Sequence, residues 1–351
     1  MLHRPRRRTL LALIASLALL ATACGGRTMD SGAGAGTTLT VYSASGLGAW
    51  LGSQFDRFTA DTGVKVELVE GGSGEVVSRL EQERADPRAD LVITLPPFIQ
   101  KAAQSGLLQP SDADVTGITS QLVGPAAIYV PIVDNALCFI ANPGADPAPA
   151  SWDDLLSPRF EGKLQYSTPG QAGDGTAMLL LLQHLMGKPR ALEYLTALHA
   201  NDIGPAPSTS QLQPKVNSGE LLIANGDVQM NLAAINNDGF DFSIFFPAMP
   251  DGSRTTISIP YVAGVTAGSP APDAAKDLLA FLLSDDVQET VGPEAFGIPV
   301  LDSVARKDAI DPGTPSPASL LDGVEVWEPN WTAVLGDFDY DLAAYRRATG
   351  E

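Results

Sequence analysis

The stretch Tyr166-Ser-Thr-Pro-Gly-Gln-Ala-Gly-Asp-Gly-Thr-Ala177 determines what the rest of the chain is expected to do. It should join the end of a short strand at 163–166 to an apolar helix at 175–186, which Gly187 ends. Its glycines let backbone N–H groups approach a bound group, and the helix start adds unpaired donors and the positive end of the helix dipole. The pattern indicates either an anion site that needs no lysine or arginine, or a flexible glycine loop without a ligand.

The first residues have the pattern of an export signal. Four arginines at positions 4–8 precede the apolar run 10–20, which is too short to span a bilayer. Leu20-Ala-Thr-Ala-Cys24 resembles a lipobox, although Ala21 stands where a larger aliphatic residue is usual. Export by the general or the twin-arginine route is left open. The sequence predicts a signal peptide at 1–23, a lipidated Cys24 and a flexible tether at 24–37.

The amino-acid composition limits which kinds of molecule the protein can bind. The whole chain has 22 Lys and Arg against 41 Asp and Glu; without residues 1–23 the numbers become 18 and 41, a net charge of −23. Such a surface repels nucleic acid and anionic lipid, so local dipoles rather than the global field must hold an anionic ligand. After lipidation only Cys138 remains, so no internal disulfide is expected, and this thiol should be a small buried core residue.

Alternating strand and helix patterns predict an α/β fold. Strands at 39–43, 64–69 and 90–94 are each followed by a helix, which implies a parallel sheet with ligands at the carboxyl ends of its strands. Extended runs near 128–140 and 255–266 would cross to a second α/β lobe and return. We therefore expect two lobes joined by two crossing segments, with a ligand cleft between them. The expected borders are 38–130 and 262–351 for lobe 1 and 131–261 for lobe 2.

An enzymatic reading lacks a nucleophile with its base. His184 and His199 fall inside predicted helices, and Glu75 stands where a nucleophile elbow needs glycine after Gly71-Gly-Ser-Gly74. The 170–176 stretch lacks the Gly-Lys-Ser/Thr ending of a nucleotide-binding loop, and no His/Cys cluster or EF-hand spacing suggests a metal. Binding is therefore favoured over catalysis, with a carboxylate-based enzyme left open.

The candidate ligand contacts lie at strand-to-helix turns, where hydroxyl and backbone donors suit a tetrahedral oxyanion. Each alone would also fit an ordinary helix N-cap. Glu75 and Asp227 could pair with a cationic group of the ligand, although Glu75 also suits its own helix dipole. Tyr261 should either wall the cleft or pack in the core. The donor candidates are Ser43, Ser45, Ser73, Gly74, Thr94, Ser167, Thr168, Gly170, Gln171 and Thr209.

Several motifs together resemble the solute-binding proteins of 2-aminoethylphosphonate ABC transporters, over nearly all of residues 38–300. The resemblance implies a type II periplasmic-binding-protein fold whose lobes close around a phosphonate, held at the Ser-Thr-Pro-Gly-Gln loop and the first-lobe turns, with the ammonium near a carboxylate. Ferric binders of the wider family carry a tyrosine pair where this chain has Gln229-Met230, so no metal is expected. The motifs are 41–46, 69–80, 94–100, 162–177, 224–231 and 260–264.

We therefore expect an extracytoplasmic, lipid-anchored binding protein that delivers 2-aminoethylphosphonate or a close organophosphonate to ABC permease subunits. It should be a monomer without a cofactor, a nucleic-acid partner or an enzymatic activity. The rival readings are a binder of another small anion such as a phosphate ester or sulfonate, a secreted carboxylate-dependent hydrolase, and a structural lipoprotein with an empty cleft.

Overall fold

The computed structural model describes residues 36–120, 122–305 and 315–351, all of which belong to one compact unit. The predicted signal peptide, the lipidated Cys24 and nearly all of the predicted tether lie outside these residues. No helix in the described ranges has both the length and the apolar content that a membrane span requires.

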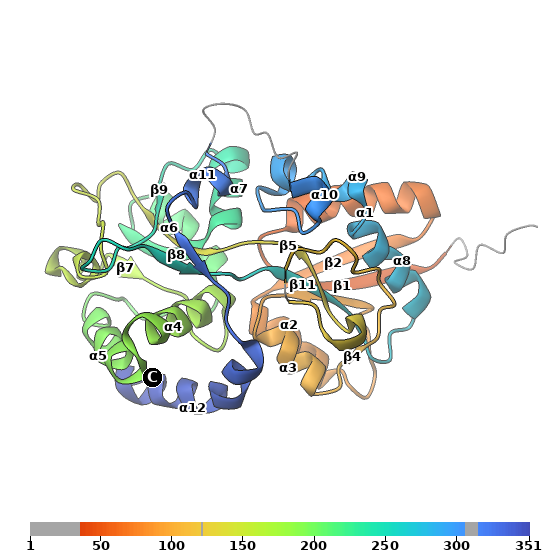
Figure 1. Cartoon of the computed structure of the whole chain (residues 1–351), viewed down its shortest axis with the longest axis horizontal. Helices are drawn as coiled ribbons and strands as arrows, with labels where there is room; N and C mark the ends of the chain where they lie inside the picture. The colour runs from red at the N-terminus through yellow and green to blue at the C-terminus, as the bar shows by residue number, and fades with distance from the viewer. Residues whose placement is uncertain (1–35, 121, 306–314) are drawn as a thin grey trace, which may run out of the picture. The chain divides into compact units, whose positions relative to one another are not determined.

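Lobe 1 is built on a six-stranded sheet with the order β2-β1-β3-β11-β4, and β5 also pairs with β11 (Figure 1). β1 runs parallel to both β2 and β3, as the three strand–helix pairs predict. β11 is antiparallel to β3 because the chain returns from the second lobe in the opposite direction. The strands are β1 (Thr38–Ala44), β2 (Lys65–Gly71), β3 (Leu91–Thr94), β4 (Leu108–Gln109), β5 (Val130–Val133) and β11 (Tyr261–Thr266).

The helices of lobe 1 cover the two faces of this sheet. α1 buries an apolar face of Trp50, Leu51, Phe55 and Phe58 and ends at Gly63, whose φ of 77° is the left-handed value that favours glycine. α2 begins at Ser73, directly after Gly72, so Ser73 and Glu75 belong to its first turn. The helices are α1 (Gly48–Thr62), α2 (Ser73–Gln82), α3 (Phe98–Gln104), α8 (Pro272–Leu282), α9 (Asp285–Gln288) and α10 (Asp302–Ala305), with a π-helical turn η5 (Val291–Ala295).

Lobe 2 is built on a four-stranded sheet with the order β7-β8-β6-β9. α4 is buried on every side over Gly173–Leu182, which explains its apolar sequence. Cys138 lies in β6 and is buried, as predicted. The elements are β6 (Leu137–Ala141), β7 (Leu164–Gln165), β8 (Ile223–Asp227), β9 (Ser243–Phe245), α4 (Gly173–Met186), α5 (Lys188–Leu198), α6 (Gln213–Asn217) and α7 (Val228–Asp238), with 3-10 turns η2 (Asp154–Leu156), η3 (Pro158–Phe160) and η4 (Thr209–Gln211). The 3-10 turn η1 (Pro125–Ala127) precedes β5 and packs in lobe 1.

Two segments cross between the lobes, as predicted. The first leads from β5 in one sheet to β6 in the other, and the second leads from β10 (Thr255–Ile257) to β11. The residue borders predicted for lobe 2, 131–261, stay a prediction; β5, which contains residues 131–133, pairs with β11 of the first sheet.

The C-terminal segment differs from the expectation that 262–351 lies in lobe 1. β12 (Glu325–Trp327) pairs in parallel with β10, after a short helix α11 (Pro317–Leu320). The last helix, α12 (Trp331–Thr349), packs along α5 of lobe 2 and also meets α3 of lobe 1 (Figure 1). Its buried residues Phe338, Leu342 and Tyr345 recur at helical spacing and join the apolar cluster around α4 and α5. Burial of this stripe therefore brings the tail across to lobe 2.

Candidate ligand site

A small pocket lies where turns from both lobes meet. It is placed at the carboxyl ends of strands, where an open α/β sheet is expected to bind ligands. Four of the predicted contacts line it: Ser45, Ser73, Thr209 and Asp227. The other lining residues are Gly71, Gly72, Leu95, Ala172, Gly173, Asp174, Ser208 and Met230.

Two long helices begin at this pocket. α4 starts at Gly173, two residues earlier than predicted, and its first backbone bond runs from the Thr176 N–H to the Ala172 carbonyl over 3.1 Å. Among the hydrogen bonds of the described residues, the N–H groups of Gly173, Asp174 and Gly175 have no acceptor. α2 starts across the pocket at Ser73. The two helix starts bring donors and positive dipole ends to one small volume, an arrangement that favours an anion.

The loop before α4 corrects one expectation, because its own amides are already occupied. The carboxamide oxygen of Asn225 accepts from Ser167 N–H at 2.8 Å, and the hydroxyl oxygen of Thr176 accepts from Gly170 N–H at 2.8 Å. The Thr168 N–H donates to the Ala206 carbonyl at 2.7 Å, and the Gln171 N–H to the Thr168 carbonyl at 3.1 Å. In this arrangement the loop supports the site, and the open donors lie in the first turn of α4.

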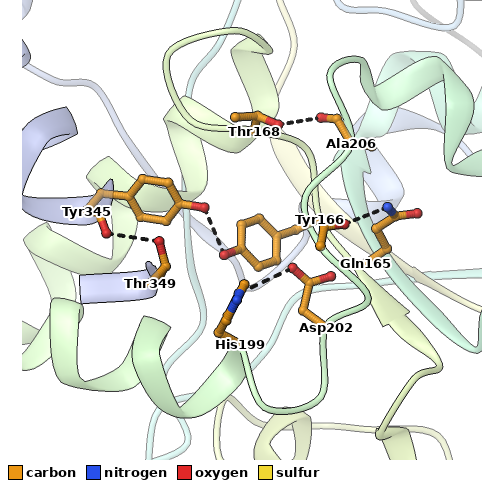
Figure 2. A network of polar contacts seen from close by, with 9 residues as sticks. Gln165, Tyr166, Thr168, His199, Asp202, Ala206, Tyr345 and Thr349 are labelled. Atoms are coloured by element: carbon orange, nitrogen blue, oxygen red, sulfur yellow. Dashed lines mark hydrogen bonds and ion pairs between the residues drawn. The ribbon is translucent and has the colours of Figure 1, made fainter. Parts of the chain in front are cut away.

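The side chains of the same loop are engaged in a similar way. The Thr168 hydroxyl donates to the Ala206 carbonyl at 2.9 Å (Figure 2). Ser167 is fully buried, and its hydroxyl oxygen accepts from the Thr209 hydroxyl at 3.1 Å. Thr209 therefore joins the pocket wall to the loop behind it.

Hydrogen bonds across the cleft hold the lobes closed on each other. The Gly74 N–H donates to the Gln171 carbonyl at 2.8 Å, which joins α2 of lobe 1 to the loop of lobe 2. Gln229 donates from its side-chain amide to the Gly46 carbonyl at 3.1 Å. A Cβ at Gly74 would lie 3.0 Å from the Gln171 carbonyl oxygen, so a larger residue would fit here only if the loop of lobe 2 moved slightly away. Gly74, Gln171 and Gln229 therefore contribute to closure.

Tyr261, expected to wall the cleft or to pack in the core, is fully buried beside the pocket. Its hydroxyl donates to the Ser45 carbonyl at 3.1 Å and lies 3.2 Å from the Gln229 carboxamide oxygen. Burial and the neighbouring carboxylates of Asp227 and Asp174 raise its pKa. The side chain therefore fixes the turn at Ser45 and does not line the pocket.

Three further predicted contacts lie away from the pocket lining. The Ser43 hydroxyl donates to the Ala44 carbonyl at 2.9 Å, and the Thr94 hydroxyl to the Ser73 carbonyl at 2.9 Å. Glu75 is exposed and accepts from the Gly72 N–H at 3.1 Å, which is the alternative role in its own helix start. Glu75 therefore lies outside the pocket lining, and its pairing with a cationic ligand group stays a prediction.

Two buried carboxylates, Asp174 and Asp227, face the pocket. Asp227 caps α7, and its Oδ1 accepts from the Met230 N–H at 2.7 Å. The second oxygen of Asp227 and Oδ1 of Asp174 have no hydrogen-bond partner among the described residues, although the two residues are 0% and 2% exposed. Asp90 is also buried, but its carboxylate is compensated, because Thr40, Ser269 and Ala271 all donate hydrogen bonds to it. The open oxygens of the pocket pair therefore suit a cationic ligand group.

The electrostatics of the pair follow from burial. Desolvation raises the pKa of Asp227 to about 6, and nearby polar groups of Met230, Asn135 and Gln229 oppose the rise, of which only the Met230 N–H donates a hydrogen bond to the carboxylate. Burial and the nearby Asp227 charge raise the pKa of Asp174 well above its ordinary value. A cation between them would restore both ionised forms. The sequence analysis did not identify Asp174 as a site residue. The signal that could have identified it is a single acid at the start of an otherwise apolar helix.

Metal binding has no comparable support. Across the described ranges, no cluster of three or more His, Cys, Asp or Glu side chains could hold an ion. Gln229 also donates to the Ala295 carbonyl at 2.7 Å and so serves the interlobe contact.

The two-lobed α/β fold with a polar pocket between its lobes defines the class of type II periplasmic binding proteins. The chain belongs to the family of bacterial extracellular solute-binding proteins, whose model matches residues 39–297. This family confirms the resemblance predicted from the motifs, and it indicates a location outside the cytoplasm.

Particular relatives narrow the family further. The chain is 42% identical over 319 residues to a Salmonella typhimurium protein named "Putative 2-aminoethylphosphonate-binding periplasmic protein", covering 89% of this chain and 93% of that protein. Among solved structures, the periplasmic binding protein P5PA matches with a TM-score of 0.71 at 21% identity, covering 90% of this chain and 98% of P5PA. Iron-bound HitA from Pseudomonas aeruginosa matches with a TM-score of 0.70 at 22% identity, covering 89% and 99%. At these identities the structural matches bear on the fold alone.

Proposed function

We propose that this protein is the extracytoplasmic receptor of an ABC importer and binds 2-aminoethylphosphonate or a close organophosphonate. The observation that carries the proposal is the juxtaposition, in one pocket, of two helix starts and two buried carboxylates with open oxygens. The two helix starts suit an anion, and the two carboxylates suit a cation. A small zwitterion with a phosphonate at one end and an ammonium at the other satisfies both.

The phosphonate would lie against the first turns of α2 and α4. The unpartnered N–H groups of Gly173–Gly175 and the hydroxyls of Ser73 and Ser208 line or border this side of the pocket, whereas the Ser45 hydroxyl donates to the Gly71 carbonyl at 3.2 Å. These donors are neutral, so they bind an oxyanion without a buried cationic side chain. This agrees with the acidic composition of the chain, which provides no attractive field for an anion.

The ammonium would lie between Asp174 and Asp227. Without a cation, the two carboxylates are desolvated and repel each other, which raises both pKa values. The same pair repels the phosphonate of a ligand that has no amine. Discrimination between aminated and amine-free anions therefore comes from repulsion as well as attraction.

Ligand capture would proceed by closure of the lobes. The bonds from Gly74 to Gln171 and from Gln229 to Gly46 join opposite walls and form only when the lobes meet. A ligand that contacts both lobes favours this state over the open one. In the same proposal Cys24 carries a lipid anchor, the protein is monomeric and without catalytic activity, and the closed form is recognised by permease subunits.

Titration calorimetry of the mature protein tests this function. We expect tight binding of 2-aminoethylphosphonate, weaker binding of ethylphosphonate and phosphate, and no product in the recovered ligand. Equal affinity for ethylphosphonate and its aminated counterpart would contradict the ammonium site. Preference for a sulfonate or phosphate ester would favour the rival anion binder, and a cleaved ligand would favour a hydrolase.

A further inference from the structure

The C-terminal helix α12 lies outside the residues matched by the family model, yet it contacts the ligand-site elements of both lobes. The family match ends at residue 297, and α12 spans Trp331–Thr349. Its buried side chains all lie along one face. That face reaches the loop before α4 on one side and the start of α3 on the other.

On the lobe 2 side, α12 is attached directly to the ligand loop. The hydroxyls of Tyr345 and Tyr166 share a hydrogen bond of 2.9 Å, and both side chains are buried (Figure 2). Leu342 packs against Gly170, where an added Cβ would lie 2.8 Å from the Leu342 Cδ1 atom. Lys188 of α5 adds ion pairs to Asp337 at 2.7 Å and to Asp341 at 2.9 Å. These contacts fix α12 to lobe 2 irrespective of closure.

On the lobe 1 side, α12 makes a smaller contact through Phe338. Its ring packs edge-on against Phe98 of α3, with centroids 6.1 Å apart and planes at 87°. The Lys101 ammonium lies 5.9 Å from the same ring. Phe98 in turn lies beside Gly74, since an added Cβ there would lie 2.9 Å from the Phe98 ring. Gly74 donates the hydrogen bond that joins the lobes, so Phe338 supports the closed arrangement at the point where it forms.

We propose that α12 is a positioning helix that holds the 166–171 loop in place and clamps the closed state through Phe338. The proposal rests on the proposed function in its use of lobe closure around a ligand. Because α12 is attached mainly to lobe 2 and meets lobe 1 chiefly through Phe338, opening the lobes breaks mainly the contacts of Phe338 with Phe98 and Lys101. Phe338 therefore acts on ligand release more than on ligand selection.

Stopped-flow binding of 2-aminoethylphosphonate to the full mature chain tests the clamp. We expect Phe338→Ala to increase the dissociation rate about three- to tenfold, the value of one aromatic pair, with an association rate within about twofold of the parent. Phe338→Leu should restore part of the loss. Tyr340→Ala is the matched control, because Tyr340 lies on the same helix but is 70% exposed.

An unchanged dissociation rate in Phe338→Ala, or a slower one, would overturn the proposal. Small-angle scattering of the ligand-free protein provides a readout that does not depend on the ligand. Phe338→Ala should increase the radius of gyration relative to the parent and to Tyr340→Ala, and an identical radius in all three would also overturn it. If the parent binds no phosphonate, the proposed function fails, and the scattering comparison still decides the role of α12.

Discussion

The replacement Asp227→Asn isolates the charge that the account assigns to ligand recognition. Oδ1 of Asp227 accepts the Met230 N–H that starts α7, and the carboxamide oxygen of asparagine can take over this bond. The change therefore keeps the helix cap and the shape of the side chain. It removes the negative charge from the oxygen that has no protein partner.

The expected loss can be worked out from this geometry. A hydrogen bond to a charged group contributes about 1.5–3 kcal/mol, and its neutral counterpart about 1 kcal/mol. The difference between the two values means that loss of the Asp227 charge should cost the ammonium contact about 0.5–2 kcal/mol, or about 2- to 30-fold in Kd, with the upper end expected because Asp227 is fully buried. Ethylphosphonate should bind Asp227→Asn as well as the parent or more tightly, since one repelling carboxylate is gone.

Calorimetry of both ligands against three proteins provides the assay. Glu75→Gln is the matched control, since Glu75 is exposed and caps its own helix outside the pocket lining. It should leave the ratio of the two affinities unchanged. A loss of similar size for both ligands in Asp227→Asn, or an equal effect in Glu75→Gln, would refute the assignment of the charge.

Further predictions address stability, pH and helix placement. Without ligand, Asp227→Asn should raise the free energy of unfolding at pH 7.5 by about 1–3 kcal/mol, because the pKa of Asp227 is about 6 in the folded state and 3.8 ordinarily. The parent protein loses stability as the pH rises from about 4 to about 6, since the buried carboxyl must then ionise. Denaturant titrations should therefore show no difference between the variant and the parent below about pH 4. Affinity for 2-aminoethylphosphonate should fall as the pH drops below about 6, because Asp227 must then lose a proton before it can bind the ammonium. Ethylphosphonate is the reference ligand, since it shares the titration of the phosphonate but has no amine. Parallel pH curves for the two ligands would contradict the pairing of Asp227 with the ammonium. Gly175→Ala should destabilise the protein by about 1–3 kcal/mol and weaken ligand binding, because the added Cβ would overlap the Ser167 carbonyl oxygen. Gly52→Ala is the control, since a Cβ at Gly52 would lie in open space and should change neither property. A Gly175→Ala variant with the stability and affinity of the parent would show that the start of α4 is not constrained.

Local patterns were sufficient to predict most of lobe 1. Strand runs followed by helices with one apolar face predict parallel βα units, and β1, β2 and β3 pair in that way. The position of the pocket at strand ends follows from the same topology. The antiparallel β11 depends on how the returning chain meets the sheet, which no local pattern encodes.

The details of the site depended on long-range contacts that the sequence does not display. Ser167 is separated by 58 residues from Asn225, whose side chain occupies its amide, so this loop could not be recognised as supporting structure. Asp174 had a weak local signal, and its role depends on Asp227, which lies far away in sequence at the end of β8. For α12, the helical spacing of Phe338 and Leu342 is visible in the sequence, but the sequence does not show which surface they pack against.

A crystal structure of the mature protein with 2-aminoethylphosphonate tests the central claim most directly. The account predicts the ligand nitrogen within hydrogen-bonding distance, about 2.7–3.2 Å, of carboxylate oxygens of both Asp174 and Asp227. It also predicts phosphonate oxygens on the first-turn N–H groups of α4 and at the start of α2. A ligand bound in the reverse orientation, or with its amine in solvent away from both carboxylates, would contradict it.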